Sequence, residues 1–237
     1  MFTRTQQLIG PEGLARLQSA RVILFGVGGV GGWCAEALVR SGIQHLTIVD
    51  FDVVDRTNIN RQVVATSANI GLPKVEEMRK RLLSINPDAD IVAVNQRFTA
   101  ETSLHGSADR SEQSEDKNFP LSTFNYIIDA IDSVKDKAEL ILAATQTDAR
   151  FFSSMGAARK LDAGKIRVSE FRKVEGCPLA RALRQRFKQM QRFPERKFTC
   201  VWSPEIIAES GTMAHIVGSF GMRLAGEVIN DCLTSLS

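Results

Sequence analysis

The segment RVILFGVGGVGGWCAEALVRS, residues 21–41, decides the fold of this chain. Its apolar run at 21–25 predicts a buried strand, and the pattern from Val30 to Ser41 predicts a helix. Gly42 follows in the position of a helix C-terminal cap. A glycine-rich turn between a strand and a helix is the context in which proteins bind a nucleotide phosphate. We therefore expect a nucleotide-binding α/β unit at this point of the chain.

The glycines of this turn have separate tasks. Gly26 permits the tight turn, Gly28 lets the backbone approach a phosphate, and Gly31 lets the helix pack closely against the strand. Gly29 completes the loop, and the helix that follows offers free N–H groups to an anion. Asp50 stands 19 residues beyond Gly31, where its carboxylate can accept hydrogen bonds from ribose hydroxyls. These features predict a nucleotide but leave NAD and ATP open.

Strand and helix patterns continue to alternate along the chain. Further strands are predicted at 45–50, 91–94 and 126–130, and further helices at 73–85 and 133–147. Alternation of this kind favours a parallel sheet with helices on both faces. After residue 150 the sequence predicts a strand at 165–172, a helix at 178–192, a strand at 198–202 and an apolar helix at 211–233. We expect a Rossmann-like, doubly wound, mostly parallel sheet that a C-terminal extension completes.

The length of 237 residues suits one large domain. We expect a single domain over residues 1–237, with a nucleotide-binding core at 21–149 and a basic substrate and dimer portion at 150–237. The segment 99–120 is polar and aperiodic, which predicts a flexible insert between two strands of the sheet.

The composition excludes several classes of protein. With 43% hydrophobic and 24% charged residues, the chain is typical of a soluble globular protein and not of a disordered or collagen-like one. The four cysteines, at 34, 177, 200 and 232, are too far apart for a zinc knuckle. The N-terminus lacks the apolar core of a signal peptide, and no apolar run is long enough to span a bilayer. The expected location is the cytoplasm.

Polar side chains gather after the predicted strands, and they favour ATP over NAD. They are Asp50, Asp52, Asn58, Arg61, Lys74 and Asp132. A triphosphate carries several negative charges that Arg and Lys can neutralise, whereas hydride transfer gains little from such a cluster. A carboxylate that follows a parallel strand and faces a triphosphate, here Asp132, is typical of a magnesium ligand. Each residue alone could be a helix cap or a surface charge.

The combined motifs resemble those of the ThiF/MoeB superfamily, relatives of ubiquitin-activating enzymes that adenylate carboxylates. The resemblance covers residues 4–175 and rests on the glycine loop and on the segments DFD (50–52), NINRQ (58–62), GLPKVE (71–76) and DAIDS (129–133). Within the superfamily, the chain is most similar to the tRNA threonylcarbamoyladenosine dehydratase branch. The pointers are Arg4-Thr5 ahead of LIG (8–10), the segment IDAIDS (128–133), and Cys177-Pro-Leu179 before a basic helix.

The resemblance implies a role for each matching residue. It implies that the phosphates are bound by Gly26, Gly28, Gly29 and Gly31. The nucleotide would also be bound by Asp50, Asp52 and Asn58. Arg61 and Lys74 would contact the triphosphate and take part in catalysis, and Asp132 would bind magnesium. Arg4 would reach in trans into the ATP site of the partner subunit of a homodimer.

The resemblance also implies the reaction. The enzyme would use ATP and magnesium to adenylate the threonyl carboxylate of threonylcarbamoyladenosine next to the anticodon of tRNA. A nitrogen of the same modification would then close a ring, with net loss of water. The alternative is adenylation of the C-terminal glycine of a ubiquitin-like sulfur carrier in the thiamine or molybdopterin pathway, which would add a sulfur-transfer or ubiquitin-like protein as partner. A non-catalytic nucleotide-binding scaffold is a third hypothesis.

The chain departs from the carrier-activating members of the superfamily in its cysteines. Those members often have paired Cys-x-x-Cys zinc motifs, which are absent here. Thioester-forming members also need a nucleophilic cysteine, for which Cys177 and Cys200 are the candidates. Cys200 lies in a predicted apolar strand and suits a packing role. Cys177 precedes a helix start, where a thiolate can be stabilised, so both a catalytic and a structural role stay open for it.

The near-neutral net charge of +3 hides an uneven distribution. Residues 150–200 have fourteen basic and four acidic side chains, a net charge of +10, and the remainder has a net charge of −7. On the helix after Pro178 one face is basic, with Arg181, Arg184, Lys188 and Arg192 as tRNA-contact candidates. This stripe could bind RNA, lie in solvent, or touch a membrane peripherally at its inner face. We expect tRNA and no DNA.

Small residues recur at helical spacing near the C-terminus. They are Ala214, Gly218, Gly221 and Ala225. Such a stripe permits close helix contact, either within the chain or between two copies.

Overall fold

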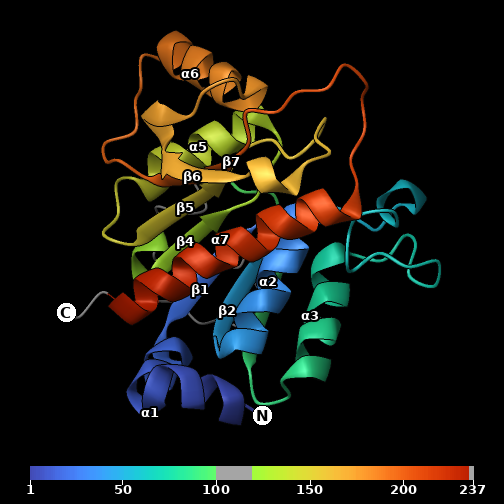
Figure 1. The fold of residues 1–237 in the computed structure, drawn as a ribbon, viewed down its shortest axis with the longest axis vertical. Helices are drawn as coiled ribbons and strands as arrows, with labels where there is room; N and C mark the ends of the chain where they lie inside the picture. Colours follow the sequence, from blue (N-terminus) through green and yellow to red (C-terminus); the bar gives the residue numbers. More distant parts are fainter. Residues whose placement is uncertain (100–118, 235–237) are drawn as a thin grey trace.

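The computed structural model describes residues 1–99 and 119–234, which contain one seven-stranded sheet (Figure 1). The order of its strands is β3-β2-β1-β4-β5-β7-β6, and every neighbouring pair is parallel except β6 and β7. The strands are β1 (Arg21–Phe25), β2 (His45–Val49), β3 (Asp90–Val94), β4 (Tyr126–Asp129), β5 (Arg150–Ser154), β6 (Arg167–Glu170) and β7 (Thr199–Trp202). The expected Rossmann-like, mostly parallel sheet is confirmed.

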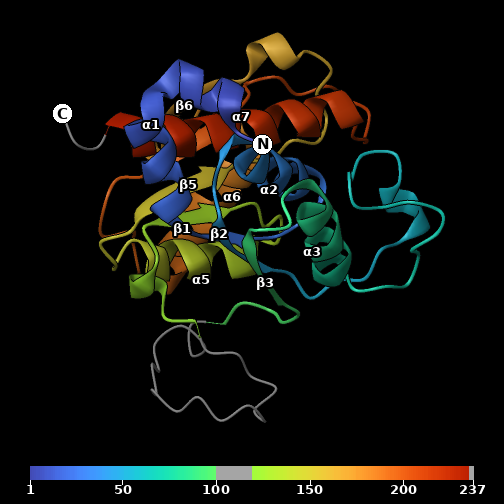
Figure 2. The same cartoon turned by 90° about the horizontal axis from the view of Figure 1, so that it is seen from below.

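Helices cover both faces of the sheet, as Figures 1 and 2 show. They are α1 (Thr3–Ser19), α2 (Gly29–Ser41), α3 (Lys74–Ile85), α5 (Val134–Ala144), α6 (Pro178–Met190) and α7 (Ala214–Thr234). Side chains of α2, α3 and α7 share a core with Val22 and Leu24, whereas those of α5 and α6 share one with Ile23 and Phe25. Because alternate residues of β1 enter different cores, the strand must be apolar on both faces, and all four of these side chains are buried.

The C-terminal helix packs against the helix that follows the glycine loop. A Cβ atom on Gly221 would lie 2.5 Å from the carbonyl oxygen of Val30, and one on Gly218 would lie 3.7 Å from Nε1 of Trp33. Val30 and Trp33 belong to the first turns of α2. The small-residue stripe of α7 therefore makes a close contact within the chain, and this contact places α7 beside the glycine loop.

The predicted elements agree with the structure, with two omissions. The sequence analysis missed α1, which Gly10 and Pro11 interrupt with a kink, and β5, whose five residues include an Arg and two Ser. The single sheet contains strands from both 21–149 and 150–237. The insert expected at 99–120 lies, apart from its ends, outside the described residues. Over the described ranges, no helix is long and apolar enough to cross a membrane.

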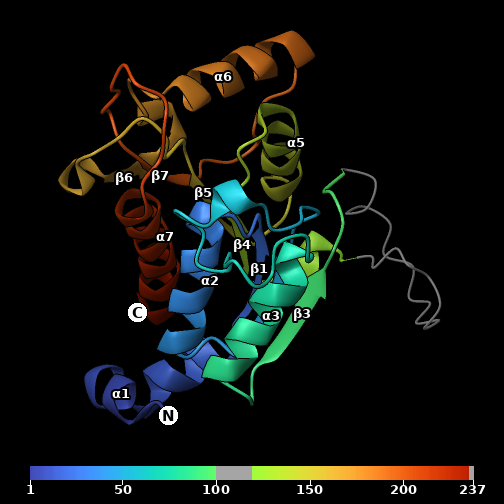
Figure 3. The same ribbon diagram turned by 90° about the vertical axis from the view of Figure 1, so that its right-hand side faces the viewer.

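Helix α1 and the end of α7 meet at the edge of the sheet opposite the carboxyl ends of its parallel strands. Because α1 ends at Ser19 and β1 begins at Arg21, α1 lies at the amino end of that strand (Figure 3). Nη1 of Arg16 in α1 donates a hydrogen bond of 2.8 Å to the carbonyl oxygen of Leu233 at the end of α7. This arrangement leaves the carboxyl ends of the strands free to form a site.

Candidate functional site

A cavity of about 420 Å³ lies at the carboxyl ends of the central parallel strands. Its walls come from the loops after β1, β2, β3, β4 and β5, and from the start of α6. Of the residues assigned to a site from the sequence, eight line it: Gly26, Gly28, Gly29, Asp50, Asp52, Arg61, Lys74 and Asp132. Open α/β sheets bind ligands at this edge, where the strand order reverses.

The glycine loop has no room for side chains. Gly26 has a φ of +86°, and a Cβ atom there would lie 2.8 Å from the carbonyl oxygen of Ala130. Gly31 does not line the cavity but lies beneath the turn, where a Cβ atom would be 1.8 Å from the carbonyl oxygen of Gly26. Gly28, Gly29 and Val30 line the cavity, so the N-terminus of α2 faces it. Unpaired N–H groups at such a terminus favour an anion.

Asp50 holds the glycine loop in place. Its Oδ2 accepts a hydrogen bond of 2.8 Å from the Val27 amide, and its Oδ1 accepts one of 2.9 Å from the Asp52 amide. Burial raises the pKa of Asp50, although these two amide donors and the nearby Lys74 oppose the shift. Each carboxylate oxygen has further acceptor capacity, which a ribose hydroxyl could use.

Lys74, the first residue of α3, forms an ion pair with Asp52. Nζ of Lys74 lies 2.8 Å from Oδ2 of Asp52, and only 6% of the Lys74 side chain is exposed against 48% of that of Asp52. The amide of Lys74 also donates to the carbonyl oxygen of Asp52 at 2.9 Å. The pair therefore holds a buried ammonium group at the wall of the cavity.

Arg61 lies on a loop that short-range hydrogen bonds stabilise. Its Nη1 donates to the carbonyl oxygen of Thr57 at 2.7 Å and to Oδ1 of Asn60 at 2.9 Å. Asn58 is buried and does not line the cavity; its Oδ1 accepts from the Asp55 amide at 3.2 Å and completes a capping box. In this structure Asn58 therefore supports the loop that presents Arg61.

Gln62 lines the cavity and has a buried oxygen without a hydrogen-bond donor. It is 7% exposed, and its Oε1 forms no hydrogen bond with any described residue. A buried carbonyl oxygen without a donor costs free energy unless another group pairs with it. The position next to the glycine loop makes a bound nucleotide or water the natural donor.

The two carboxylates after β4 have different surroundings. Asp129 is fully buried, and its Oδ2 lies 2.8 Å from Nζ of Lys137 and accepts from Ser153 Oγ at 2.7 Å. Lys137 also donates to the carbonyl oxygen of Ile131 at 2.8 Å, and Asp129 Oδ1 accepts from the Ile131 amide at 3.0 Å. This buried pair fixes the loop that presents Asp132. Asp132 is exposed and makes no hydrogen bond or ion pair within the described part of the chain.

The cavity suits a magnesium ion only together with a ligand. Over the described ranges, no group of three His, Cys, Asp or Glu side chains could hold a metal ion. Magnesium binds to one or two carboxylates and completes its shell with substrate phosphates and water. The unpaired carboxylate of Asp132 fits this mode of binding.

Several lining residues were missed in the sequence analysis. Cζ of Arg97 lies 5.1 Å from the centroid of the Phe51 ring, and Nη2 of Arg97 is 2.8 Å from Oδ2 of Asp136. All three line the cavity, as does Leu179 at the start of α6. Arg97 follows β3, so its place after a parallel strand was a usable signal. The sequence could not show that α6 lines the cavity, because this depends on how residues 150–237 pack against the nucleotide-binding core.

The basic candidates on α6 are not equivalent. Arg181 and Lys188 are exposed, and their side chains form no ion pair or hydrogen bond with described residues. Arg184 instead donates from Nη2 to the carbonyl oxygens of Val174 at 2.6 Å and Phe171 at 2.9 Å. A single acidic partner faces Arg192, whose Nη1 lies 3.7 Å from Oε2 of Glu139. Lys188 and Arg181 are therefore the exposed cations of the stripe whose side chains have no partner among the described residues.

Arg4 and the cysteines lie away from the cavity. Arg4 is exposed on α1, which is at the amino end of β1, whereas the cavity is at its carboxyl end. All four cysteines are buried, and none lines the cavity. Burial raises the pKa of Cys200 in β7, which opposes thiolate formation there.

Comparison with known proteins agrees with this architecture. Residues 2–233 match the ThiF family. The tRNA threonylcarbamoyladenosine dehydratase of Bacillus subtilis is 37% identical over 188 residues, which are 79% of this chain and 69% of that protein. The molybdopterin-synthase adenylyltransferase of Salmonella typhimurium is 31% identical over 221 residues, 92% of this chain and 75% of that one. The E. coli tRNA N6-threonylcarbamoyladenosine dehydratase TcdA, solved in complex with ATP, has a TM-score of 0.84 at 29% identity and covers 99% of this chain and 94% of its own.

The buried ion pair behind the cavity predicts a contrast between two substitutions. Lys137→Met leaves the Asp129 carboxylate buried without its cation, so we expect it to lower the free energy of unfolding by about 3 kcal/mol or more. Asp132→Asn alters an exposed, unpaired group, and we expect a change within about 0.5 kcal/mol. Urea unfolding followed by circular dichroism measures both. Equal stability of the Lys137→Met variant and the wild-type protein would show that the pair does not hold this loop.

Proposed function

The chain belongs to the ThiF family, and we propose from this premise that it is an ATP-dependent adenylating dehydratase of threonylcarbamoyladenosine in tRNA. The observation that carries the proposal is the cavity at the strand ends. It combines a glycine loop at a helix N-terminus, the carboxylate of Asp50, the cations of Arg61 and Lys74, and the unpaired carboxylate of Asp132. These groups supply the phosphate, ribose and magnesium contacts that adenylation of a carboxylate needs within one chain.

The charge at the cavity favours ATP. Lys74 and Arg61 supply positive charge at the wall of the cavity, and both hold their positions through hydrogen bonds within the chain. Preorganised cations stabilise the charge that develops on phosphates during transfer. We assign Arg61 and Lys74 to the triphosphate, and Asp50 with Asp52 to the ribose end of the nucleotide. Asn58 contributes by supporting the loop of Arg61.

The reaction has two steps whose atoms balance. First, an oxygen of the threonyl carboxylate attacks the α-phosphorus of ATP, and pyrophosphate leaves. The carboxylate becomes an acyl-adenylate with AMP as its leaving group. Then a nitrogen of the same modification attacks the activated carbonyl carbon, AMP departs with one of the original carboxylate oxygens, and the nitrogen loses its proton. The sum is loss of one water from the nucleoside, at the expense of one ATP.

The chain's own residues position these groups. Asp132 is the residue that would hold magnesium, which neutralises phosphate charge when it is bound. The N-terminus of α2 binds the phosphates, and the apolar walls of the cavity exclude water from the acyl-adenylate, which water would otherwise hydrolyse. No thioester is required, in agreement with four cysteines that are buried outside the cavity.

The tRNA substrate is assigned to the basic side of the C-terminal portion. Leu179 at the start of α6 lines the nucleotide cavity, and the exposed Arg181 and Lys188 follow on the same helix. Cations near a phosphate backbone gain affinity through release of counterions. We therefore place the anticodon arm along α6, with its modified adenosine at the cavity, in a cytoplasmic enzyme.

The chain is also proposed to act as a homodimer. Because Arg4 lies at the far end of its own sheet, it could reach a nucleotide only in another copy of the chain. A two-fold dimer would place each Arg4 symmetrically against the partner's site.

The function predicts a mass change in tRNA. Purified protein incubated with ATP, magnesium and tRNA that contains threonylcarbamoyladenosine should convert this nucleoside to a product lighter by one water, as measured by nucleoside mass spectrometry. Arg61→Ala should slow the conversion by about a hundredfold or more, because it removes a cation from the phosphates. Arg56→Ala is the matched control, since this arginine lies in the same loop outside the cavity.

The outcome separates the hypotheses. Unchanged nucleoside mass with a protein that still binds ATP contradicts the dehydratase function. Pyrophosphate exchange stimulated by a ubiquitin-like sulfur carrier and not by tRNA would support the carrier-activating alternative. ATP binding without any ATP turnover would support the non-catalytic scaffold.

Mixed dimers test the role of Arg4. Arg4→Ala and Arg61→Ala chains should each be inactive alone, because every site lacks one residue. After subunit exchange, a heterodimer has one complete site, so about a quarter of wild-type activity should return. Activity in the mixture no greater than in either variant alone would show that Arg4 does not act in trans.

A further inference from the structure

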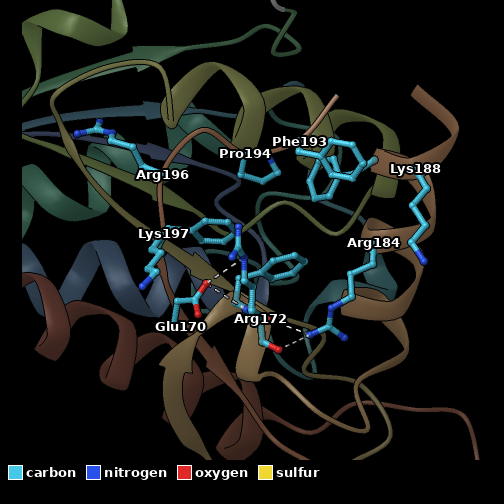
Figure 4. A pocket seen from close by; sticks show the side chains of 11 residues that line it. Glu170, Arg172, Arg184, Lys188, Phe193, Pro194, Arg196 and Lys197 are labelled. Carbon is cyan, nitrogen blue, oxygen red and sulfur yellow. Dashed lines mark hydrogen bonds and ion pairs between the residues drawn. The ribbon is translucent and has the colours of Figure 1, made fainter. Parts of the chain in front are cut away.

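A second cavity lies at the far end of α6 (Figure 4). It has a volume of about 260 Å³ and is formed by the end of β6, the last turns of α6 and the segment 193–198 that leads into β7. We call it the aromatic pocket, because four phenylalanines line it: Phe171, Phe187, Phe193 and Phe198. None of its lining residues lines the nucleotide cavity.

The rings of the pocket form a preorganised apolar floor. Phe171 and Phe198 are stacked with centroids 5.0 Å apart and an interplanar angle of 17°, and both are buried. Cζ of Arg184 lies 5.1 Å from the centroid of Phe171. In contrast, Phe193 is 60% exposed, and with Pro194 it lies on the side of the pocket opposite Glu170 and Arg172 (Figure 4). An exposed aromatic ring beside a rigid floor offers a stacking partner to a flat ligand.

The rim of the pocket is strongly cationic. Lys197 and Arg196 lie on one side of the rings and Lys188 and Arg184 on the other (Figure 4). The side chains of Lys188 and Lys197 form no ion pair or hydrogen bond with described residues. Arg184 donates to backbone carbonyls, which are neutral, so its positive charge is not cancelled. Among the described residues that line the pocket, Glu170 is the one acidic residue.

The pocket is connected to the nucleotide cavity along one helix. Leu179 lines the nucleotide cavity, and Lys188 lines the aromatic pocket nine residues later. At 1.5 Å per residue this is a separation of about 13 Å along α6. A basic groove lined by Arg181, Arg184 and Lys188 lies on the helix in between. Successive nucleotides of a stacked strand are about 3.4 Å apart. A strand with one nucleotide at the nucleotide cavity would therefore reach the aromatic pocket with a nucleotide about four positions away.

We propose that the aromatic pocket binds one unpaired base of the anticodon loop, which stacks on Phe193 while Lys188 and Lys197 contact the flanking phosphates. The inference rests on the proposed tRNA substrate and deepens it. Unpaired bases that stack on aromatic side chains beside a positive groove are the usual mode of single-stranded recognition. A lipid surface would require a broad exposed apolar face, whereas here Phe193 is exposed and the other three rings are buried in a concave site that fits a planar group.

The test compares binding of two RNAs by fluorescence anisotropy without ATP. One RNA is a labelled unmodified anticodon stem-loop, and the other is the paired stem as a duplex without a loop. Phe193→Ala should weaken binding of the stem-loop about tenfold or more and leave the duplex unaffected, because only an unpaired base can stack. Lys188→Gln should lower the dependence of log Kd on log salt concentration by about 0.7, the contribution of one phosphate contact.

The matched control is Leu161→Ala, which truncates another exposed apolar side chain, 54% exposed and outside the pocket. Its RNA affinity should equal that of the wild-type protein, and ATP affinity of all variants should be unchanged. Equal weakening of both RNAs by Phe193→Ala, or no effect on the stem-loop, overturns the proposal, as does wild-type protein that binds the stem-loop no better than the duplex.

Two further results are informative. Loss of binding to phosphatidylglycerol vesicles in Phe193→Ala, with stem-loop affinity intact, would assign the pocket to a membrane surface and overturn the RNA assignment. If the proposed dehydration fails but stem-loop affinity still depends on Phe193, the pocket is an RNA site on an enzyme of another specificity. The two failures are therefore distinguishable.

Discussion

The close approach of three backbone segments at the glycine loop is the constraint on which the rest of the site depends. A Cβ atom on Gly26 would collide with the carbonyl of Ala130, and one on Gly31 would collide with the carbonyl of Gly26. Because no side chain fits, the end of β1, the start of α2 and the loop after β4 meet at van der Waals distance. The hydrogen bond from Val27 to Asp50 then adds the end of β2. The glycine loop, the carboxylate of Asp50 and the loop of Asp132 therefore lie together around one turn.

The polar groups around this turn divide into supports and contacts. Asp129 and Lys137 are fully buried and satisfy one another, so they hold the loop and cannot meet a ligand. Asp132, three residues beyond Asp129, is exposed and without an internal partner. Asn58 and Arg61 show the same division, since Asn58 is buried and completes the capping box of the short helix that precedes Arg61, whereas Arg61 lines the cavity. Buried networks give the exposed residues a fixed geometry, which is the condition for electrostatic preorganisation.

The order of strands and helices followed from the sequence because β1 to β4 are short apolar runs with glycine or polar residues at their ends. The cluster of Asp50, Asp52, Arg61, Lys74 and Asp132 was also predictable, since the ends of parallel strands share one edge of the sheet. The pattern could not reveal β5, whose RFFSS segment has only two apolar residues, or the different burial of Asp129 and Asp132. Nor could it reveal that α6 extends from the nucleotide cavity to the aromatic pocket, because this depends on how residues 150–202 pack against the rest of the sheet.

The central claim is that the carboxylate of the substrate attacks the α-phosphorus of ATP. Transfer of an oxygen label tests it most directly. tRNA whose threonyl carboxylate contains ¹⁸O in both oxygens would be converted with unlabelled ATP in unlabelled water, and the released AMP would be analysed by mass spectrometry. Adenylation predicts one ¹⁸O atom in each AMP formed, because the leaving group retains the bridging oxygen of the substrate. Unlabelled AMP, or ¹⁸O found in inorganic phosphate together with ADP, would contradict the account.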